Sequence, residues 1–126
     1  MTQRRIVALV DDLMVRSRIE AAAPRGTELI FPPNQAAFTR ALDPPPGLIV
    51  VGLTATRQPW SELIRASRAD PATRAVPVVA FGPHKDLELR RRAIEAGADR
   101  VLANSAFMLA LPQLLRGEPP PDNMTT

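Results

Sequence analysis

Two adjacent carboxylates, Asp11 and Asp12, directly follow the apolar run at residues 6–10. Together with water, such a pair could bind Mg²⁺, which takes oxygen ligands and usually keeps several waters. The pair also suits the start of a helix, because acidic side chains there accept amide hydrogen bonds and lie at the positive end of the helix dipole. We prefer the helix interpretation and expect no specific metal site, although weak binding at Asp11 and Asp12 stays open.

Other residue types that could do chemistry are sparse. The chain has no cysteine, which excludes disulfides and thiolate chemistry. Its one histidine, His84, follows Gly82 and Pro83, and the sequence offers it no partners for a metal site or a catalytic triad, so we expect it to be exposed. Gly52 and Gly82 end two apolar runs, where glycines could open a backbone-lined cleft but more often permit tight turns.

The charge pattern argues against a nucleic-acid interface. Lysine and arginine total 16 against 13 acidic residues, and the basic residues are scattered along the chain. The run Arg90, Arg91 and Arg92 could form a docking patch. Spacing of about one helical turn predicts local pairs of Asp86 with Arg90, Glu88 with Arg92 and Arg91 with Glu95, so we prefer a solvated helix face. With no apolar run near the roughly 18 residues of a membrane span and no export signal, a soluble cytoplasmic protein is expected.

Short apolar runs alternate with longer amphipathic stretches, which predicts strands covered by helices on both faces. The predicted strands are residues 5–10, 28–31, 48–51, 76–81 and 100–103, and the predicted helices are 13–23, 34–42 with Asn34 as N-cap, one from Pro59 to about Asp70, 86–96 and 108–116. The last helix is started at Met108 because Pro112 is tolerated only near a first turn. Trp60 is expected in the core.

Five alternating units in 126 residues predict one α/β domain over residues 1–116, with a five-stranded parallel sheet that is doubly wound in the flavodoxin-like order 2-1-3-4-5. Any ligand crevice should then lie beyond the carboxyl ends of the strands. The proline-rich segment 117–126 is expected to be a disordered or extended tail.

Three stretches of this chain resemble the receiver domain of two-component response regulators. They are IVALVDD at residues 6–12, DPATRAVPVVA at 70–80 and AIEAGADRVL at 93–102, and the resemblance extends over about residues 4–116. It implies a fold built for Mg²⁺-assisted phosphoryl transfer to an aspartate. Asp11 and Asp12 match the metal-binding pair of that family.

The remaining working positions of the family are replaced here. Gly52 stands where the resemblance implies the acceptor aspartate, and Gly82 stands at the position of a threonine or serine. Val101 takes the place of a tyrosine or phenylalanine, and Asn104, followed by Ser105, takes the place of a lysine–proline pair. Without the nucleophile, phosphoryl transfer to this strand end is excluded.

These replacements predict a stand-alone pseudo-receiver that acts in signal transduction through phosphorylation-independent protein–protein contacts. We expect no enzyme activity and no cofactor. The resemblance implies a protein partner or a homodimer at the fourth helix, fifth strand and fifth helix. The candidate polar contacts there are Arg90, Arg91, Arg92, Asp99 and Arg100. The alternative is a small-molecule binder or enzyme that uses the crevice around Asp11, Asp12, Gly52, Gly82 and Asn104.

Overall fold

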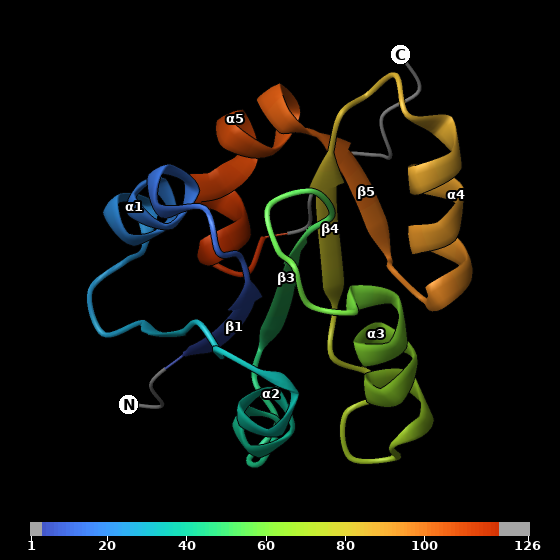
Figure 1. The fold of residues 1–126 in the computed structure, drawn as a ribbon. Coiled ribbons are helices and arrows are strands. Elements are labelled where there is room, and N and C mark those ends of the chain that lie inside the picture. The colour runs from blue at the N-terminus through green and yellow to red at the C-terminus, as the bar shows by residue number, and fades with distance from the viewer. Residues whose placement is uncertain (1–3, 119–126) are drawn as a thin grey trace.

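The computed structural model describes residues 4–118, which form the predicted parallel sheet in the order β2-β1-β3-β4-β5. The strands are β1 (Arg5–Leu9), β2 (Glu28–Ile30), β3 (Leu48–Gly52), β4 (Val78–Gly82) and β5 (Arg100–Ala103). The helices are α1 (Leu13–Ala22), α2 (Gln35–Ala41), α3 (Trp60–Ala69), α4 (Leu87–Ala96) and α5 (Asn104–Leu115). The flavodoxin-like fold expected from the alternation of apolar runs is confirmed (Figure 1).

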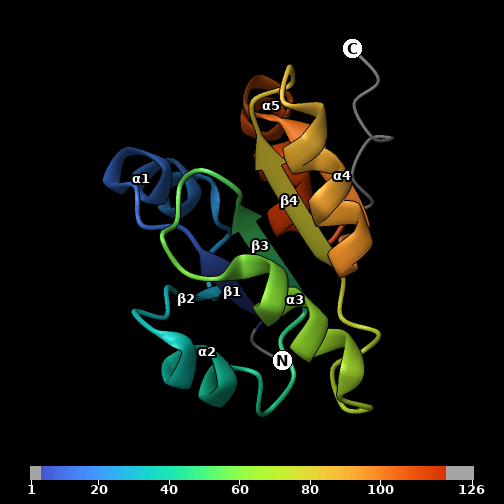
Figure 2. The same cartoon turned by 45° about the vertical axis from the view of Figure 1, so that its right-hand side comes forward.

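The helices cover both faces of the sheet. Helices α1 and α5 pack on one face, where Ile19 and Phe107 are fully buried, and α2, α3 and α4 pack on the other (Figures 1 and 2). Every residue of β3 and β4 is buried, as expected for central strands of a two-faced parallel sheet. Trp60 is 6% exposed and belongs to the core between α3 and the sheet, which confirms its expected place.

Several helix ends follow from their capping residues. The Asn34 side chain accepts a hydrogen bond from the backbone N–H of Ala37 (2.9 Å), and the Asp86 side chain accepts one from Leu89 (3.0 Å). Each cap satisfies one of the amides that a first helical turn leaves unpaired. Gly97 ends α4 at φ 122°, a conformation that favours glycine because it has no Cβ.

The predicted start of the last helix at Met108 is wrong, because α5 begins at Asn104 and contains Pro112 in its interior. Pro112 lacks the N–H that would bond the Met108 carbonyl, and its ring crowds the preceding turn. The longer helix nevertheless buries five side chains against the sheet: Phe107, Ala110, Leu111, Leu114 and Leu115. Burial of that face outweighs the local cost of the proline.

The first two residues of the predicted tail, Gly117 and Glu118, are held against α5. The N–H of Gly117 donates to the Leu114 carbonyl (3.0 Å) and that of Glu118 to the Gln113 carbonyl (3.0 Å), so both residues fold back on the end of α5. Residues 119–126, the rest of the predicted tail, lie outside the described part of the chain. Among the described helices, none has the length and apolar character that would let it cross a membrane.

Candidate functional site

The carboxyl edge of the sheet brings the predicted site positions together. Asp11 and Asp12 follow β1, Gly52 ends β3, Gly82 ends β4, and Asn104 is the first residue of α5 after β5. The strand register aligns these ends, because Gly52 pairs with Phe81 and Gly82 with Ala103. The edge where this fold usually binds ligands is therefore also where the chain places its candidate residues.

Asp12 is the N-cap of α1. Its Oδ1 accepts hydrogen bonds from the backbone N–H groups of Met14 (2.9 Å) and Val15 (3.1 Å). The helix-start interpretation is thus confirmed for this residue, and the carboxylate is already engaged in stabilising the helix.

Asp11 instead anchors the β3–α3 loop, residues 53–59. Its Oδ2 accepts hydrogen bonds from the Arg57 N–H (2.8 Å) and from Thr56 Oγ1 (3.2 Å), and its own N–H donates to the Ala55 carbonyl (2.6 Å). Further along the same loop, Gln58 Nε2 donates to the Pro32 carbonyl (2.7 Å). The loop is therefore fastened over the ends of β1 and β2, which sequence spacing alone did not indicate.

The space around Gly52 is filled. A Cβ atom at this position would lie 2.8 Å from the Cβ of Ala55 and 2.9 Å from Cζ of Phe81, closer than real Cβ contacts. The Phe81 ring is 2% exposed and stacks on Phe107 of α5, with ring centroids 3.9 Å apart and planes 8° apart. Gly52 opens no cleft, because two neighbouring side chains occupy the volume that a side chain would need.

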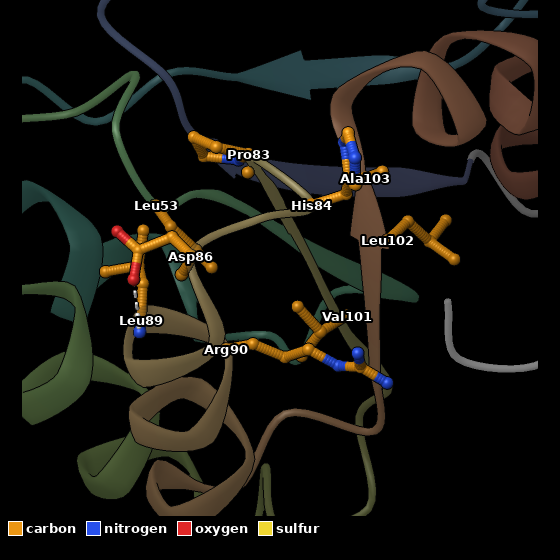
Figure 3. Close-up of a pocket in the computed structure, with 10 residues that line it drawn as sticks. Leu53, Pro83, His84, Asp86, Leu89, Arg90, Val101, Leu102 and Ala103 are labelled. Atoms are coloured by element: carbon orange, nitrogen blue, oxygen red, sulfur yellow. Dashed lines mark hydrogen bonds between the residues drawn. The ribbon is translucent and has the colours of Figure 1, made fainter. Parts of the chain in front are cut away.

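Gly82 has a different environment. A Cβ atom there would lie 3.4 Å from Leu53 Cβ, an ordinary contact, and the glycine lines a small notch between the ends of β4 and β5 and the start of α4. Figure 3 shows Arg90 reaching from α4 towards β5 beside Val101. Val101 and the Arg90 side chain of the neighbouring helix thus both line this notch.

The expected single crevice is divided. An open hollow of about 670 Å³ lies over Asp11 and Asp12 and is walled by the β3–α3 loop and Pro33, whereas Gly82 lines the separate notch together with Leu53. Within residues 4–118, no group of three or more histidine, cysteine or acidic side chains could hold a metal ion. Asp11 and Asp12 are the acidic residues of the hollow, and both already accept protein hydrogen bonds.

Asn104 and Ser105 open α5 without a side-chain cap. The N-cap residue is Ala103, which cannot accept hydrogen bonds from the first amides of the helix. A hollow of about 350 Å³ lies here, lined by both residues together with Pro83, His84 and Lys85. His84 is exposed, as expected for a lone loop histidine.

Comparison with known proteins gives matches only at the level of structure. No family profile and no curated protein sequence matches the chain. A response regulator from Hahella chejuensis superposes with a TM-score of 0.74 at 19% identity, over 90% of this chain and 92% of that one. The chemotaxis response regulator CheY4 of Vibrio cholerae gives 0.73 at 16% identity, over 91% and 98%.

A phosphorylated cyanobacterial phytochrome response regulator, RcpA, gives a TM-score of 0.72 at 16% identity, over 92% of this chain and 91% of that one. The chain has the fold of a response regulator receiver domain. Identities below 20% in these three pairs show the receiver fold alone, so the chemistry of the strand ends must be argued from the residues described above.

The predicted ion pairs of Arg90, Arg91 and Arg92 with acidic residues of α4 are correct only in part. Arg91 binds Glu88 and Glu95 on α4, and these hydrogen bonds raise its pKa above the usual value. Glu88 therefore pairs with Arg91 and not with Arg92, whose guanidinium lies 4.9 Å above the Trp60 ring. Arg90 has no acidic partner among the described residues, because Asp86 caps α4 instead.

Asp99 is tied into the scaffold at the opposite edge of the sheet. Its Oδ2 accepts hydrogen bonds from the Val78 N–H (2.7 Å) and from Arg68, whose guanidinium also donates to the carbonyls of Gly97, Arg74 and Val76. Asp99 thus joins α3, β4 and the α4–β5 turn, and it lies away from Arg90 at the other end of α4. Its predicted place in an interaction surface stays untested.

The residues that decide the character of this edge, Phe81 and Ala55, were not singled out from the sequence. In the sequence, Phe81 is one apolar residue among several in its strand. Its contact with Gly52 depends on the register between β3 and β4. In the sequence, the only sign of this contact is a glycine at the end of one predicted strand and a large residue near the end of the next. Such a signal becomes visible once the strand order and register are known.

Proposed function

We propose that this protein is a signalling module with the receiver fold that acts through contacts with another protein and is not switched by aspartyl phosphorylation. The observation that carries the proposal is the environment of Gly52. The strand end lacks a carboxylate, and the Phe81 ring and Ala55 fill the volume where one would stand.

Phosphoryl transfer needs an in-line nucleophile, with a metal ion and cations to stabilise the transferring group. Asp11 and Asp12 lie just after the end of β1 at this edge of the sheet, and their carboxylates are engaged with the β3–α3 loop and with α1. Gly82 and Asn104 supply neither a hydroxyl nor a cation at the ends of β4 and β5. The proposal is therefore that Gly52, Gly82, Val101 and Asn104 mark a phosphorylation site that has been lost, with Asp11 and Asp12 retained for structure.

A module of this kind works through its surface. The exposed part of α4 carries two large apolar side chains, Leu87 (67% exposed) and Ile94 (45% exposed), beside Arg90 and Arg91. Apolar side chains rimmed by charge are typical of protein contact sites. This face, with the start of α5, is the proposed place of contact.

The test of phosphorylation uses purified protein with Mg²⁺ and a small acyl-phosphate donor, followed by intact-mass measurement. We expect no stoichiometric gain of about 80 Da, the mass of a phosphoryl group. RcpA, which is known in a phosphorylated form, serves as the positive control for the donor. An alkali-labile adduct that maps to Asp11 or Asp12 and is lost in Asp11→Asn or Asp12→Asn would contradict the proposal.

A further inference from the structure

We propose that the hollow over Asp11 and Asp12 binds a free basic amino acid such as lysine or ornithine, a small molecule with two ammonium groups and one carboxylate. This inference goes beyond the proposed function and does not depend on the contact face of α4. The hollow of about 670 Å³ falls within the range of small-molecule sites, about 300–1,000 Å³. Its wall carries charges of both signs, from Asp11, Asp12 and Arg57.

The structural roles of the two aspartates leave one oxygen of each unused. Asp11 holds the β3–α3 loop through Oδ2, and Asp12 caps α1 through Oδ1. Within residues 4–118, Asp11 Oδ1 and Asp12 Oδ2 accept no hydrogen bond, and both residues are exposed. A cation that enters the hollow can therefore bind both carboxylates without breaking the bonds that hold the loop and the helix.

The guanidinium of Arg57 lies on the same wall and is not neutralised. The Arg57 N–H donates to Asp11 (2.8 Å), so the two residues are neighbours, yet the described part of the chain contains no ion pair of Arg57 with Asp11 or Asp12. Figures 1 and 2 show the loop that carries Arg57 arching beyond the end of β3 on the side of α1. The hollow thus keeps unpaired groups of opposite charge next to each other, which suits a ligand that also carries both signs.

Gln58 adds an acceptor to the same wall. Its Nε2 donates to the Pro32 carbonyl (2.7 Å), whereas its Oε1 is buried and has no hydrogen-bond partner in the described part of the chain. Buried polar atoms without a partner are rare in proteins, and leaving one unpaired costs free energy. An N–H donor of a ligand in the hollow is the kind of partner that Gln58 lacks.

The balance of charges selects the class of ligand. Two carboxylates and one guanidinium are complemented by two cations and one anion, which is the charge pattern of a basic amino acid. Because Asp11 and Arg57 are neighbours, the α-ammonium and the carboxylate of the ligand fit there, and the side-chain ammonium extends to Asp12. An ammonium group has three donors, so it can serve Gln58 Oε1 as well as a carboxylate.

Other small ligands match this hollow less well. No group of three or more metal-ligating side chains occurs within residues 4–118, so a divalent cation would find only the two free carboxylate oxygens. A phosphate or a dicarboxylate would pair with Arg57 and be repelled by both aspartates. A simple diamine would leave Arg57 unpaired. The observations therefore favour a ligand with both ammonium and carboxylate groups.

The test titrates isotope-labelled protein with L-lysine, in a buffer of low ionic strength with EDTA, and follows the amide signals of the β3–α3 loop by NMR. We expect shifts of these signals that saturate. L-Norleucine lacks the side-chain ammonium and cadaverine lacks the carboxylate, so each should bind at least about fivefold more weakly than L-lysine. L-Glutamate has the reverse charge pattern and should give no saturable shift.

Two variants each remove one charge from the hollow and keep the structural bonds. Asp12→Asn retains an oxygen for the α1 cap and should weaken L-lysine at least about fivefold without changing the affinity for L-norleucine. Arg57→Gln retains the N–H that binds Asp11 and should weaken L-lysine by a similar factor without changing the affinity for cadaverine. Glu20→Gln and Arg65→Gln make the same charge changes at exposed residues outside the hollow, and should leave L-lysine binding nearly unchanged.

The absence of saturable shifts with L-lysine up to about 10 mM would overturn the inference. Equal affinities for L-lysine, L-norleucine and cadaverine would also overturn it, as would equal losses in a hollow variant and its matched control. Binding of L-lysine that appears only after Mg²⁺ is added would overturn it in favour of a metal site. The same spectra show whether each variant is folded, which separates lost binding from lost structure.

Discussion

Adding one methyl group at Gly52 should destabilise the protein, whereas the same change at Gly82 should not. Both glycines are buried strand ends at the same edge of the sheet, and neither has a positive φ. The two sites differ in the room for a Cβ atom. At Gly52 the nearest atoms would be 2.8 Å and 2.9 Å away, and at Gly82 the nearest would be 3.4 Å away.

The magnitudes follow from these distances. Replacing glycine with alanine in a strand gains about 0.5–1 kcal/mol when there is room, because the unfolded chain loses conformational freedom. Overpacking a well-filled core costs about 1–3 kcal/mol. Gly52→Ala should therefore lower the free energy of unfolding by about 1–2 kcal/mol, and Gly82→Ala should raise it slightly or leave it unchanged.

Urea denaturation followed by the fluorescence of Trp60, the only tryptophan, and by far-UV circular dichroism measures both values. A double-mutant cycle then tests the cause. Phe81→Leu removes the ring atoms that meet the new Cβ, so combining it with Gly52→Ala should show a favourable coupling of about 0.5–2 kcal/mol. Ala55→Gly should give a coupling of the same sign.

Equal stabilities for Gly52→Ala and Gly82→Ala, or additive behaviour of Gly52→Ala with Phe81→Leu, would refute the reasoning. The space at the end of β3 would then be adaptable, and the closed strand end would no longer support the proposed function.

Three further substitutions test other parts of the scaffold. Arg68→Ala should lower the free energy of unfolding by about 2–3 kcal/mol, because it removes the side-chain donor to the carbonyls of Gly97, Arg74 and Val76 and one of the two donors to Asp99. Arg65→Ala on the exposed side of α3 should change it by less than about 0.5 kcal/mol. Asp12→Ala should cost about 1 kcal/mol through loss of the α1 cap, with Asp12→Asn nearly neutral, both read by urea denaturation. Pro112→Ala should raise the thermal midpoint, because it restores an N–H donor inside α5; an unchanged or lower midpoint would show that the helix has adapted fully to the proline.

The order of the elements could be predicted from the sequence because the strands lie in mostly apolar runs bounded by capping or turn residues. The strand order was predicted from the five alternating strand–helix units. Asn34, Asp86 and Gly97 act as local signals that need no tertiary information. The start of α5 was missed because the local cost of Pro112 was weighed without the burial that offsets it.

The character of the candidate site depends on contacts between distant segments. Asp11 meets Thr56 and Arg57 across the sheet edge, and Phe81 of β4 meets Gly52 on the neighbouring strand β3. No periodicity or spacing along the chain encodes such contacts. The positions of the replaced residues could be read from the sequence, but the filling of the space around them could not.

The stacked rings of Phe81 and Phe107 make the substitutions at this edge depend on their order. A carboxylate at position 52 forces Phe81 or Ala55 to shift unless these residues are made smaller first, since its Cβ alone already meets both. Shrinking Phe81 first removes the stack on α5 and leaves a cavity, which lowers stability before any gain at position 52 is possible. Whether position 52 or position 81 is changed first, the route to an acceptor aspartate passes through a less stable intermediate. The loss of stability at this first step opposes the return of the aspartate by single substitutions.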